Sequence, residues 1–541
     1  MLRHRRPRAS AFVAVAVVAA VGLAGCSSTV GGQASPVPGA AARSSSASPS
    51  TSPSTSPSAQ SPTSTSAASG GITVPTSPSL VPAASQEPDG ATGTVGYPGI
   101  GDPYYPTAGN GGYQVDSYDI TLSYDPATND LRSTAQIKGS VTSDEGLTQF
   151  DLDLQPSMKV TSVQVDGADA DFEQQRAELV ITPAAALASQ AAMTVDISYG
   201  GQPVLIPGGT AGLGDGGWYR TSSGGAVAIG EPFAASAWYP VNEHPADPAT
   251  FSVTATVPQD WQVISNGIRE TDGLPDPGAE KSVFRWSIKE PIASYLTTIY
   301  IDKFTVVTDA LADGTPIVSA LGPDAQNAKQ LAEDTRRVIE VLSGYFGPYP
   351  FESVGGIFTG QKVGFALETA TRPVYGNFAD LDFVVHELAH QWYGDKVTVE
   401  RWSDICLNEC FASYASWLWK EKVDGENLDG YWKQQMATVV DDVNYWKSPL
   451  VDMGAGEEFT RVYDRGPLAL HALRKEMGED SFFAMLKGWP ADFGGKNATF
   501  DDFETYASAA TGEDLKPFID AWFRGTTVPA QEFRYPGGLG N

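Results

Sequence analysis

The chain has 541 residues, of which 64 are acidic and 35 are basic, so its formal net charge is −29 at neutral pH. A surface of this sign favours solubility and argues against nucleic acid as a partner, because phosphate binding needs clustered lysine and arginine side chains. Three cysteines in a chain of this length indicate a structure held by its core rather than by many disulfide bonds.

The first 25 residues have the pattern of an export signal. Four arginines lie between positions 3 and 8, an apolar run follows over 11–23, and small residues then lead to Cys26. This pattern is that of a signal peptide, not of a transmembrane helix. The sequence Leu-Ala-Gly-Cys over 23–26 resembles a bacterial lipobox, which implies cleavage before Cys26 and lipid on its sulfur. The lipid would anchor the chain to the extracytoplasmic face of the cell membrane, whereas plain secretion without Cys26 is the alternative.

The next segment, over 26–100, is rich in serine, threonine, proline and alanine and has almost no aromatic residues. Such a segment cannot bury enough apolar surface to offset its chain entropy. We therefore expect a disordered tether that holds the folded part away from the membrane. Its hydroxyl groups are candidates for O-glycosylation.

The remaining residues, roughly 440 in number, are enough for two domains with substantial cores. Alternating apolar and polar residues over 118–124, 251–257 and 295–301 predict strands, so we expect a β domain over 101–313. Helical periodicity follows, beginning with a long amphipathic helix over 326–346, and indicates a second domain over 314–541. The predicted class is multidomain α+β.

A metal site is predicted by the segment 386–390, which reads His-Glu-Leu-Ala-His within an apolar helix over 381–393. His386 and His390 are four residues apart, so both imidazoles project from one face of the helix. A catalytic zinc ion takes three protein ligands and keeps its fourth position for water. Glu387, between the histidines, would take a proton from that water.

The third ligand is predicted to be Glu409, in a second helix over 404–422. Eighteen residues separate it from His390, the spacing of a zinc set of two histidines and one glutamate. The alternative is a buried helix whose histidines only pack. For His244, in a loop before a proline, and His471, in a helical run over 468–477, we expect structural roles because neither has other ligand types nearby.

Two cysteines, Cys406 and Cys410, flank Glu409 in the predicted helix. Thiolates are good zinc ligands, but the set of two histidines and one glutamate is already complete and extra thiolates would fill the water position. Helical residues four apart have Cα atoms about 6 Å from each other, within disulfide range, although their Cβ atoms do not point at each other. The sequence leaves a Cys406–Cys410 disulfide open.

These motifs, with the run Gly-Phe-Ala-Leu-Glu-Thr-Ala-Thr-Arg over 364–372, resemble the zinc aminopeptidases of the aminopeptidase N and leukotriene hydrolase family. The resemblance covers about 102–527. It implies one zinc ion per chain and a saddle-like, all-β N-terminal domain followed by a thermolysin-like catalytic domain.

Further site residues follow from this resemblance. Ala366 to Thr369 stand at the last four positions of the family's Gly-x-Met-Glu-Asn motif, which implies that Ala366 and Glu368 contact the substrate and that Glu368 holds its free amine. Phe365 and Thr369 replace the motif's glycine and asparagine. Glu231 matches a second amine-binding acid, although a solvated loop carboxylate is the alternative. Tyr463, in a run similar to the Tyr-x-Lys-Gly element, would donate a hydrogen bond to the oxyanion.

The predicted function is that of an aminopeptidase, a monomer that acts on peptides with a free N-terminal amine. Many family members continue into a large helical domain that covers the site, and no sequence remains here to build it, so we expect an open cleft. Two alternatives stay open. One is a zinc hydrolase of a non-peptide substrate, an epoxide or an ester, and the other is a catalytically silent peptide-binding or adhesion protein.

Overall fold

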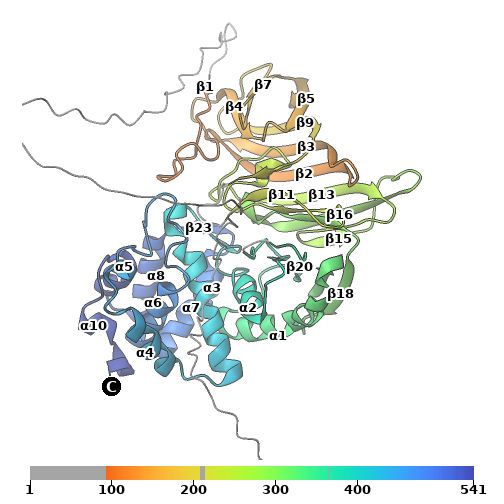
Figure 1. Cartoon of the computed structure of the whole chain (residues 1–541). Coiled ribbons are helices and arrows are strands. Elements are labelled where there is room, and N and C mark those ends of the chain that lie inside the picture. Colours follow the sequence, from red (N-terminus) through yellow and green to blue (C-terminus); the bar gives the residue numbers. More distant parts are fainter. Residues whose placement is uncertain (1–92, 208–213, 363–364, 541) are drawn as a thin grey trace, which may run out of the picture. The chain divides into compact units, whose positions relative to one another are not determined.

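The computed structural model describes residues 93–207, 214–362 and 365–540 (Figure 1). Cys26, the predicted export signal and nearly all of the predicted tether lie outside the described residues. A β-rich half precedes a mainly helical half, which confirms the predicted α+β class. Within the described part, no helix is both long and apolar enough to cross a lipid bilayer.

The largest sheet of the β domain has eight strands in the order β15-β16-β13-β2-β3-β9-β5-β6. Along β2, Tyr118, Ile120 and Leu122 are buried while the residues between them are more exposed, because one face of the strand packs on the core. The strands are β2 (Tyr113–Asp125), β3 (Asp130–Val141), β5 (Met158–Val165), β6 (Ala168–Asp169), β9 (Ala192–Gly201), β13 (Ala249–Pro258), β15 (Ile268–Glu270) and β16 (Lys281–Ile292).

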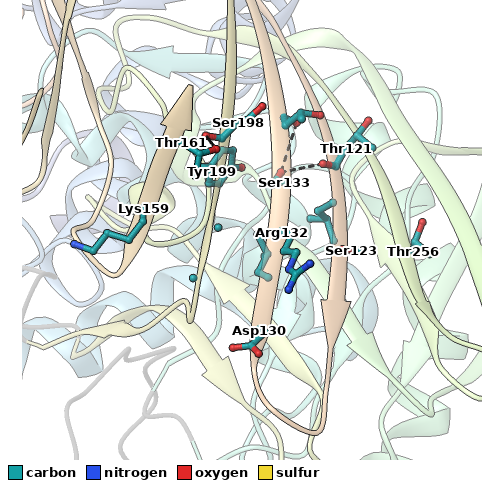
Figure 2. A pocket seen from close by; sticks show the side chains of 15 residues that line it. Thr121, Ser123, Asp130, Arg132, Ser133, Lys159, Thr161, Ser198, Tyr199 and Thr256 are labelled. Carbon is teal, nitrogen blue, oxygen red and sulfur yellow. Dashed lines mark hydrogen bonds between the residues drawn. The ribbon is translucent and has the colours of Figure 1, made fainter. Parts of the chain in front are cut away.

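The outer face of this sheet carries a cavity of about 740 Å³ (Figure 2). Arg132 of β3 and Lys159 of β5 both pair with Gly200 of β9, so the two cations flank a position without a side chain. Hydroxyl side chains, among them Thr121 and Ser198, line the rest. None of the predicted site residues lines this cavity.

Two smaller sheets complete the β domain. A four-stranded sheet has the order β1-β4-β8-β7, and a five-stranded sheet has the order β10-β11-β12-β17-β14. Thr94 pairs with Leu147, so the folded part begins before residue 101, inside the segment predicted as tether. The strands are β1 (Thr94–Val95), β4 (Leu147–Asp153), β7 (Asp171–Gln175), β8 (Glu178–Thr182), β10 (Leu205–Ile206), β11 (Gly216–Arg220), β12 (Ala226–Ile229), β14 (Gln262–Ser265) and β17 (Ile299–Asp302).

The predicted domain boundary at 313/314 falls inside a hairpin. β18 (Thr305–Ala310) and β19 (Pro316–Leu321) are antiparallel neighbours, and β19 continues the sheet through β20 (Ile357–Phe358) to β21 (Val374–Tyr375). Asp313 and Gly314 are the turn residues, with Gly314 at φ 94°. The hairpin therefore belongs with the second domain, and the turn between its strands is not a domain boundary.

In the second domain, α2, which carries His386, packs against α1 and α3 (Figure 1). The predicted helix over 326–346 begins as a 3₁₀ turn and becomes α1 at Lys329. α2 is shorter than predicted. It ends at Ala389, and the chain then bends at Gly394, which has φ 128°. The elements are α1 (Lys329–Phe346), α2 (Leu381–Ala389), β22 (Val397–Val399), α3 (Cys406–Trp419), α4 (Leu428–Val439), α5 (Val443–Trp446), α6 (Arg465–Met477), α7 (Glu479–Phe493), β23 (Lys496–Ala498), α8 (Phe500–Thr511), α9 (Lys516–Ile519) and α10 (Gln531–Arg534).

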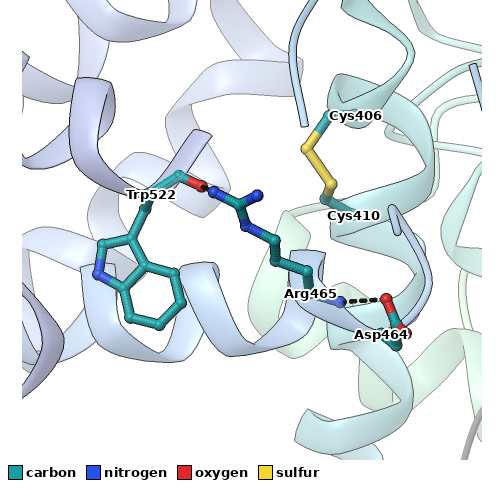
Figure 3. The surroundings of a disulfide bond; sticks show 5 residues. All are labelled: Cys406, Cys410, Asp464, Arg465 and Trp522. Atoms are coloured by element: carbon teal, nitrogen blue, oxygen red, sulfur yellow. Dashed lines mark hydrogen bonds between the residues drawn. A yellow bond between two sulfur atoms is a disulfide. The ribbon is translucent and has the colours of Figure 1, made fainter. Parts of the chain in front are cut away.

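A disulfide bond joins Cys406 and Cys410 in the first turn of α3 (Figure 3). Their Cα atoms are 4.8 Å apart, closer than in the regular helix assumed from sequence. α6 packs directly against this turn, since a Cβ atom on Gly466 would lie 2.6 Å from the Cys410 sulfur. Arg465 precedes this glycine and donates to the carbonyl oxygens of Ser448 and Trp522. The disulfide thus lies on the inner face of α3, against α6.

Candidate metal and substrate site

Three buried side chains from two helices meet at one point. Nε2 of His386 lies 3.1 Å from Nε2 of His390 and 3.1 Å from Oε2 of Glu409. The remaining side of the triangle, from His390 to Glu409, is 3.4 Å. Ligand atoms around a tetrahedral zinc ion, at about 2.0–2.1 Å from it, lie roughly 3.3–3.4 Å from one another. The three side chains therefore fit a single ion of this kind.

The tautomer of His390 supports a metal site here. Nδ1 of His390 lies 3.0 Å from the carbonyl oxygen of Tyr393, to which only a protonated nitrogen can donate. The lone pair of His390 Nε2 is then directed at the triangle, as a metal ligand requires. Without metal, His390 carries a proton on this nitrogen as well, and its charge together with His386 lowers the pKa of Glu409 to about 2 despite burial; a metal ion would take the place of that proton beside the anionic carboxylate.

Glu387 is buried beside the triangle, on the helix that carries both histidines. One carboxylate oxygen each of Glu387 and Glu368, with a nitrogen of His390, lie within 4.8 Å of one another. Burial, with the nearby Glu368 carboxylate, raises the pKa of Glu387 well above its ordinary value. A carboxylate whose proton affinity is raised in this way is suited to accept and return a proton.

Two further carboxyl groups, those of Glu231 and Glu368, are buried close to the same point. Oε1 of each has no hydrogen-bond partner among the described residues. Burial raises the pKa of Glu368 to about 7, and burial together with Glu368 raises the pKa of Glu231 well above its ordinary value. A cation between them would satisfy both oxygens, and a protonated amine has the required charge and hydrogens.

Tyr463 contacts the carboxylate oxygen of Glu409 that does not face His386. Its hydroxyl donates to Oε1 of Glu409 at 3.2 Å, and its ring centroid is 5.9 Å from that of His386. Burial, then the charge of Glu409, raises the pKa of Tyr463 well above its ordinary value. The hydroxyl therefore keeps its proton and remains a hydrogen-bond donor.

Ala366 is half-buried against the core, two residues before Glu368. Between them, Leu367 forms an isolated antiparallel β-bridge with Val374. The structure thus brings the predicted ligands, Glu387, Tyr463, Glu231 and Glu368 to one place. Ala366 lies on the adjoining segment.

The other two histidines of the described part have protein partners. Nε2 of His244 lies 3.2 Å from Oδ2 of Asp102. His471 lies 3.0 Å from the Tyr414 hydroxyl and 3.0 Å from Asp429. None of these partners belongs to the metal triangle. Both histidines therefore have the structural roles expected from the sequence.

Some residues that shape the site carried no clear signal in the sequence. Gln391 follows His390 directly and contacts the backbone of Glu368. Asn266, from the β domain, holds the backbone of Ala370. Both roles depend on contacts between distant parts of the chain. Only the position of Gln391 beside a predicted ligand could have drawn attention to it.

Comparison with known families matches both halves of the chain. Residues 114–296 match the peptidase M1 N-terminal domain, and residues 351–522 match the peptidase family M1 domain. The chain belongs to the M1 peptidase family. This confirms the resemblance to aminopeptidases of the aminopeptidase N type, and the second match contains the metal triangle, Glu387, Glu368 and Tyr463.

Several M1 relatives have names that state an activity. A leucyl aminopeptidase of Saccharolobus solfataricus is 24% identical over 76% of this chain and 53% of its own length. A glutamyl aminopeptidase of Rattus norvegicus is 26% identical over 57% of this chain and 36% of its own length. The chain thus spans between a third and slightly more than half of the length of these relatives.

Solved structures include an M1 neighbour of similar extent. An M1 zinc metallopeptidase from Deinococcus radiodurans has a TM-score of 0.72 and 27% identity, and the similarity covers 81% of this chain and 99% of the other. A two-domain M1 zinc metallopeptidase variant bound to L-arginine has a TM-score of 0.72 and 26% identity over 80% of this chain and 99% of its own. The arrangement of a β domain followed by a catalytic domain is therefore that of known two-domain M1 peptidases.

Proposed function

We propose that the chain is a zinc aminopeptidase that hydrolyses the N-terminal peptide bond of peptides. The proposal rests on one observation: a metal-binding site and a candidate amine-binding site lie next to each other in the buried interior. A triangle of metal ligands lies beside two carboxyl groups, those of Glu231 and Glu368, whose Oε1 atoms have no protein partner. The names of two relatives, a leucyl and a glutamyl aminopeptidase, support the same activity.

Zinc would be held by His386, His390 and Glu409, whose mutual distances fit it. When bound, zinc supplies a Lewis acid that polarises a carbonyl and lowers the pKa of water. Glu387 is not one of the three ligands, and its buried carboxyl group moves the proton from the attacking water to the departing amine.

Tyr463 donates a hydrogen bond to the oxygen of the reacting carbonyl. In the structure its hydroxyl donates to Glu409, so turning toward a substrate exchanges one acceptor for another. Because the pKa of Tyr463 is raised by burial, the group remains a donor as negative charge develops on that oxygen. A donor directed at the oxygen where charge develops stabilises the transition state more than the ground state.

Glu231 and Glu368 determine which bond is cut. A substrate ammonium held between them satisfies both partnerless oxygens and fixes the first peptide bond over the metal ligands. A substrate peptide that continued beyond its ammonium position would meet these buried carboxyl groups in place of solvent. The enzyme is thus expected to remove one residue at a time.

The test compares a peptide with its N-acetylated twin. The free peptide is expected to be shortened stepwise, and the acetylated one to be cut slowly or not at all, because acetylation removes the charge that the two glutamates bind. Glu368→Ala should lower kcat/KM for the free peptide by a factor of 100 or more, since it leaves one carboxylate of a buried charge cluster. A chelator should abolish cleavage and zinc should restore it.

The same assay distinguishes the other readings of this site. Rapid internal cleavage of the acetylated peptide, seen as interior fragments by mass spectrometry, would indicate an endopeptidase. Hydrolysis of an ester or an epoxide without peptide cleavage would indicate a zinc hydrolase of another substrate class. Binding of the free peptide without any turnover in the presence of zinc would indicate a catalytically silent binding protein.

We also propose that the enzyme is attached to the outer face of a bacterial cell membrane by lipid on Cys26. The proposal rests on the lipobox-like residues 23–26 and on the following segment of low complexity. In a bacterium that lipidates proteins, the full chain should incorporate an alkyne-labelled fatty acid, and Cys26→Ser should not. Recovery of unlabelled parent protein in the medium would indicate plain secretion.

A further inference from the structure

The side-chain amide of Gln391 uses its full hydrogen-bonding capacity. Its oxygen accepts from the backbone N–H of Thr371 at 2.8 Å and lies 3.2 Å from the Tyr349 hydroxyl, whose proton it shares with the carbonyl of Ser353. Its nitrogen donates to the backbone carbonyl of Glu368 at 3.2 Å and to Oδ2 of Asp395 at 2.6 Å. The residue is fully buried. A terminal amide offers two hydrogens and two lone pairs, so nothing remains unused.

Two of these partners determine how the amide is oriented. The N–H of Thr371 can only donate and the carbonyl of Glu368 can only accept, so rotating the amide by 180° would set like groups against each other. Gln391 therefore holds the segment 366–372, which we call the anchor loop, at two backbone points in one fixed orientation. Since Gln391 follows His390 directly, these points are tied to the helix end that carries a metal ligand.

The β domain holds the anchor loop from its other side. Nδ2 of Asn266 donates to the carbonyl of Ala370 at 2.7 Å, and the Thr371 hydroxyl accepts from the N–H of Gly267 at 2.7 Å. Thr371 has φ 65°, a region that β-branched residues rarely occupy. Such a backbone persists only where its surroundings over-determine it. The hydrogen bonds from both sides provide this constraint.

We propose that Gln391 is a positioning residue, which fixes the distance between the amine-binding Glu368 and the metal ligands and thereby restricts cleavage to the first peptide bond. The inference deepens the proposed function and rests on it. Gln391 contacts neither the ligand triangle nor the carboxyl group of Glu368 among the described hydrogen bonds; it acts through the backbone of that residue. Loss of its two bonds to the anchor loop, one donated to the Glu368 carbonyl and one accepted from the Thr371 N–H, would let that loop move relative to His390.

Two substitutions of Gln391 test its accepted and its donated hydrogen bonds separately. Gln391→Met keeps the side-chain length and removes all four hydrogen bonds. Gln391→Glu keeps the acceptor for Thr371 and Tyr349, but sets a carboxylate oxygen against the Glu368 carbonyl and against Asp395. The matched control is Tyr349→Phe, which removes one bond to the same amide and leaves both bonds to the anchor loop intact.

The readout is binding, so that turnover is not needed. Zinc-loaded protein carrying Glu387→Gln is titrated calorimetrically with L-leucinamide and with N-acetyl-L-leucinamide, and the ratio of the two affinities measures amine selection. We expect Gln391→Met and Gln391→Glu to lower this ratio by roughly 10-fold, which corresponds to about 1.4 kcal/mol. Zinc content should stay at one ion per chain, and Tyr349→Phe should leave the ratio within about 2-fold of the parent value.

A double-mutant cycle tests whether Gln391 acts through Glu368. In a Glu368→Gln background the amine anchor is already weakened, so Gln391→Glu should change the ratio little further. A ratio that falls by the same factor in both backgrounds would overturn the proposal, as would variants that lose thermal stability but keep the parent ratio. If the parent itself did not prefer the free amine, the proposed amine-binding function would fail, and the role of Gln391 with it. Should Gln391→Met not fold, Gln391→Glu gives the same comparison.

Discussion

The carboxylate of Glu409 is shared between Tyr463 and the histidines. Its Oε1 accepts the Tyr463 hydroxyl at 3.2 Å, while its Oε2 lies 3.1 Å from Nε2 of His386. One side chain thus joins the predicted ligand set to the predicted donor for the oxyanion. A tyrosine that turned toward a substrate would give up only its bond to Oε1.

Tyr463→Phe is expected to lower kcat by roughly 100-fold with little change in KM, because only the hydroxyl is lost and it acts mainly on the transition state. Steady-state kinetics on an aminoacyl anilide measure both parameters. Since the ring and its packing beside His386 remain, zinc content should not change. An unaltered kcat would assign Tyr463 a purely structural role.

Glu387→Gln is expected to reduce hydrolysis by a factor of 1,000 or more while zinc remains bound, because the carboxyl group moves a proton and is not one of the three ligands. The amide has the same shape but cannot accept the proton. Metal content is measured by atomic emission beside the activity. His386→Ala is the contrasting variant, which should lose both zinc and activity; loss of zinc from Glu387→Gln as well would mean that Glu387 is a ligand.

The disulfide between Cys406 and Cys410 should be detectable by alkylation. In denatured protein without reductant, the peptides that carry these cysteines should take up no label, and after reduction they should take up two. Because the bond closes a very short loop, its removal should lower the free energy of unfolding by roughly 2 kcal/mol or less. Urea unfolding of Cys406→Ala/Cys410→Ala measures this, and reductant should not affect that variant. Full labelling before reduction would show free thiols.

The stability of the β domain should depend on pH through Asp247. This buried carboxyl group accepts from the Val115 N–H and from Asn242, and burial raises its pKa from 3.8 to about 7. Between about pH 4 and pH 7 the folded state therefore binds a proton that the unfolded state has lost. The free energy of unfolding should fall across this window, by up to about 1.4 kcal/mol per pH unit for one such group.

Asp247→Asn isolates this contribution, because the amide resembles the protonated acid and cannot ionise. The variant should exceed the parent in stability by a smaller margin at pH 5 than at pH 8, as measured by urea unfolding at both values. Equal slopes for the two proteins would show that Asp247 is ionised in the folded state at neutral pH.

The metal ligands could be predicted from sequence because their geometry is local. The spacing of His386 and His390 follows from the period of one helix, and Glu409 lies on the next helix, which packs directly against the first. The end of α2 was predicted too late, since the bend at Gly394 depends on how the chain packs there. The hairpin turn at Asp313 and Gly314 looked like a domain boundary because helical periodicity begins shortly after it.

The support of the site could not be predicted in the same way. Gln391 and Asn266 reach the anchor loop from elements far apart in the chain, and their contacts are with backbone groups, which every residue possesses. Neither the composition of a sequence nor the spacing of its residues indicates such contacts. The Cys406–Cys410 disulfide stayed undecided for a related reason, because a regular helix directs the two Cβ atoms apart and the true separation at the start of α3 is smaller.

The anchor loop takes hydrogen bonds from the β domain as well as from the metal-binding helix, with Asn266 on one side and Gln391 on the other. The ligand triangle lies in one domain, but under the proposed function the recognition of a peptide's first residue would be assembled by both. An exchange of whole β domains between relatives would then change how strictly the end of a substrate is recognised, while the histidine helix stayed the same.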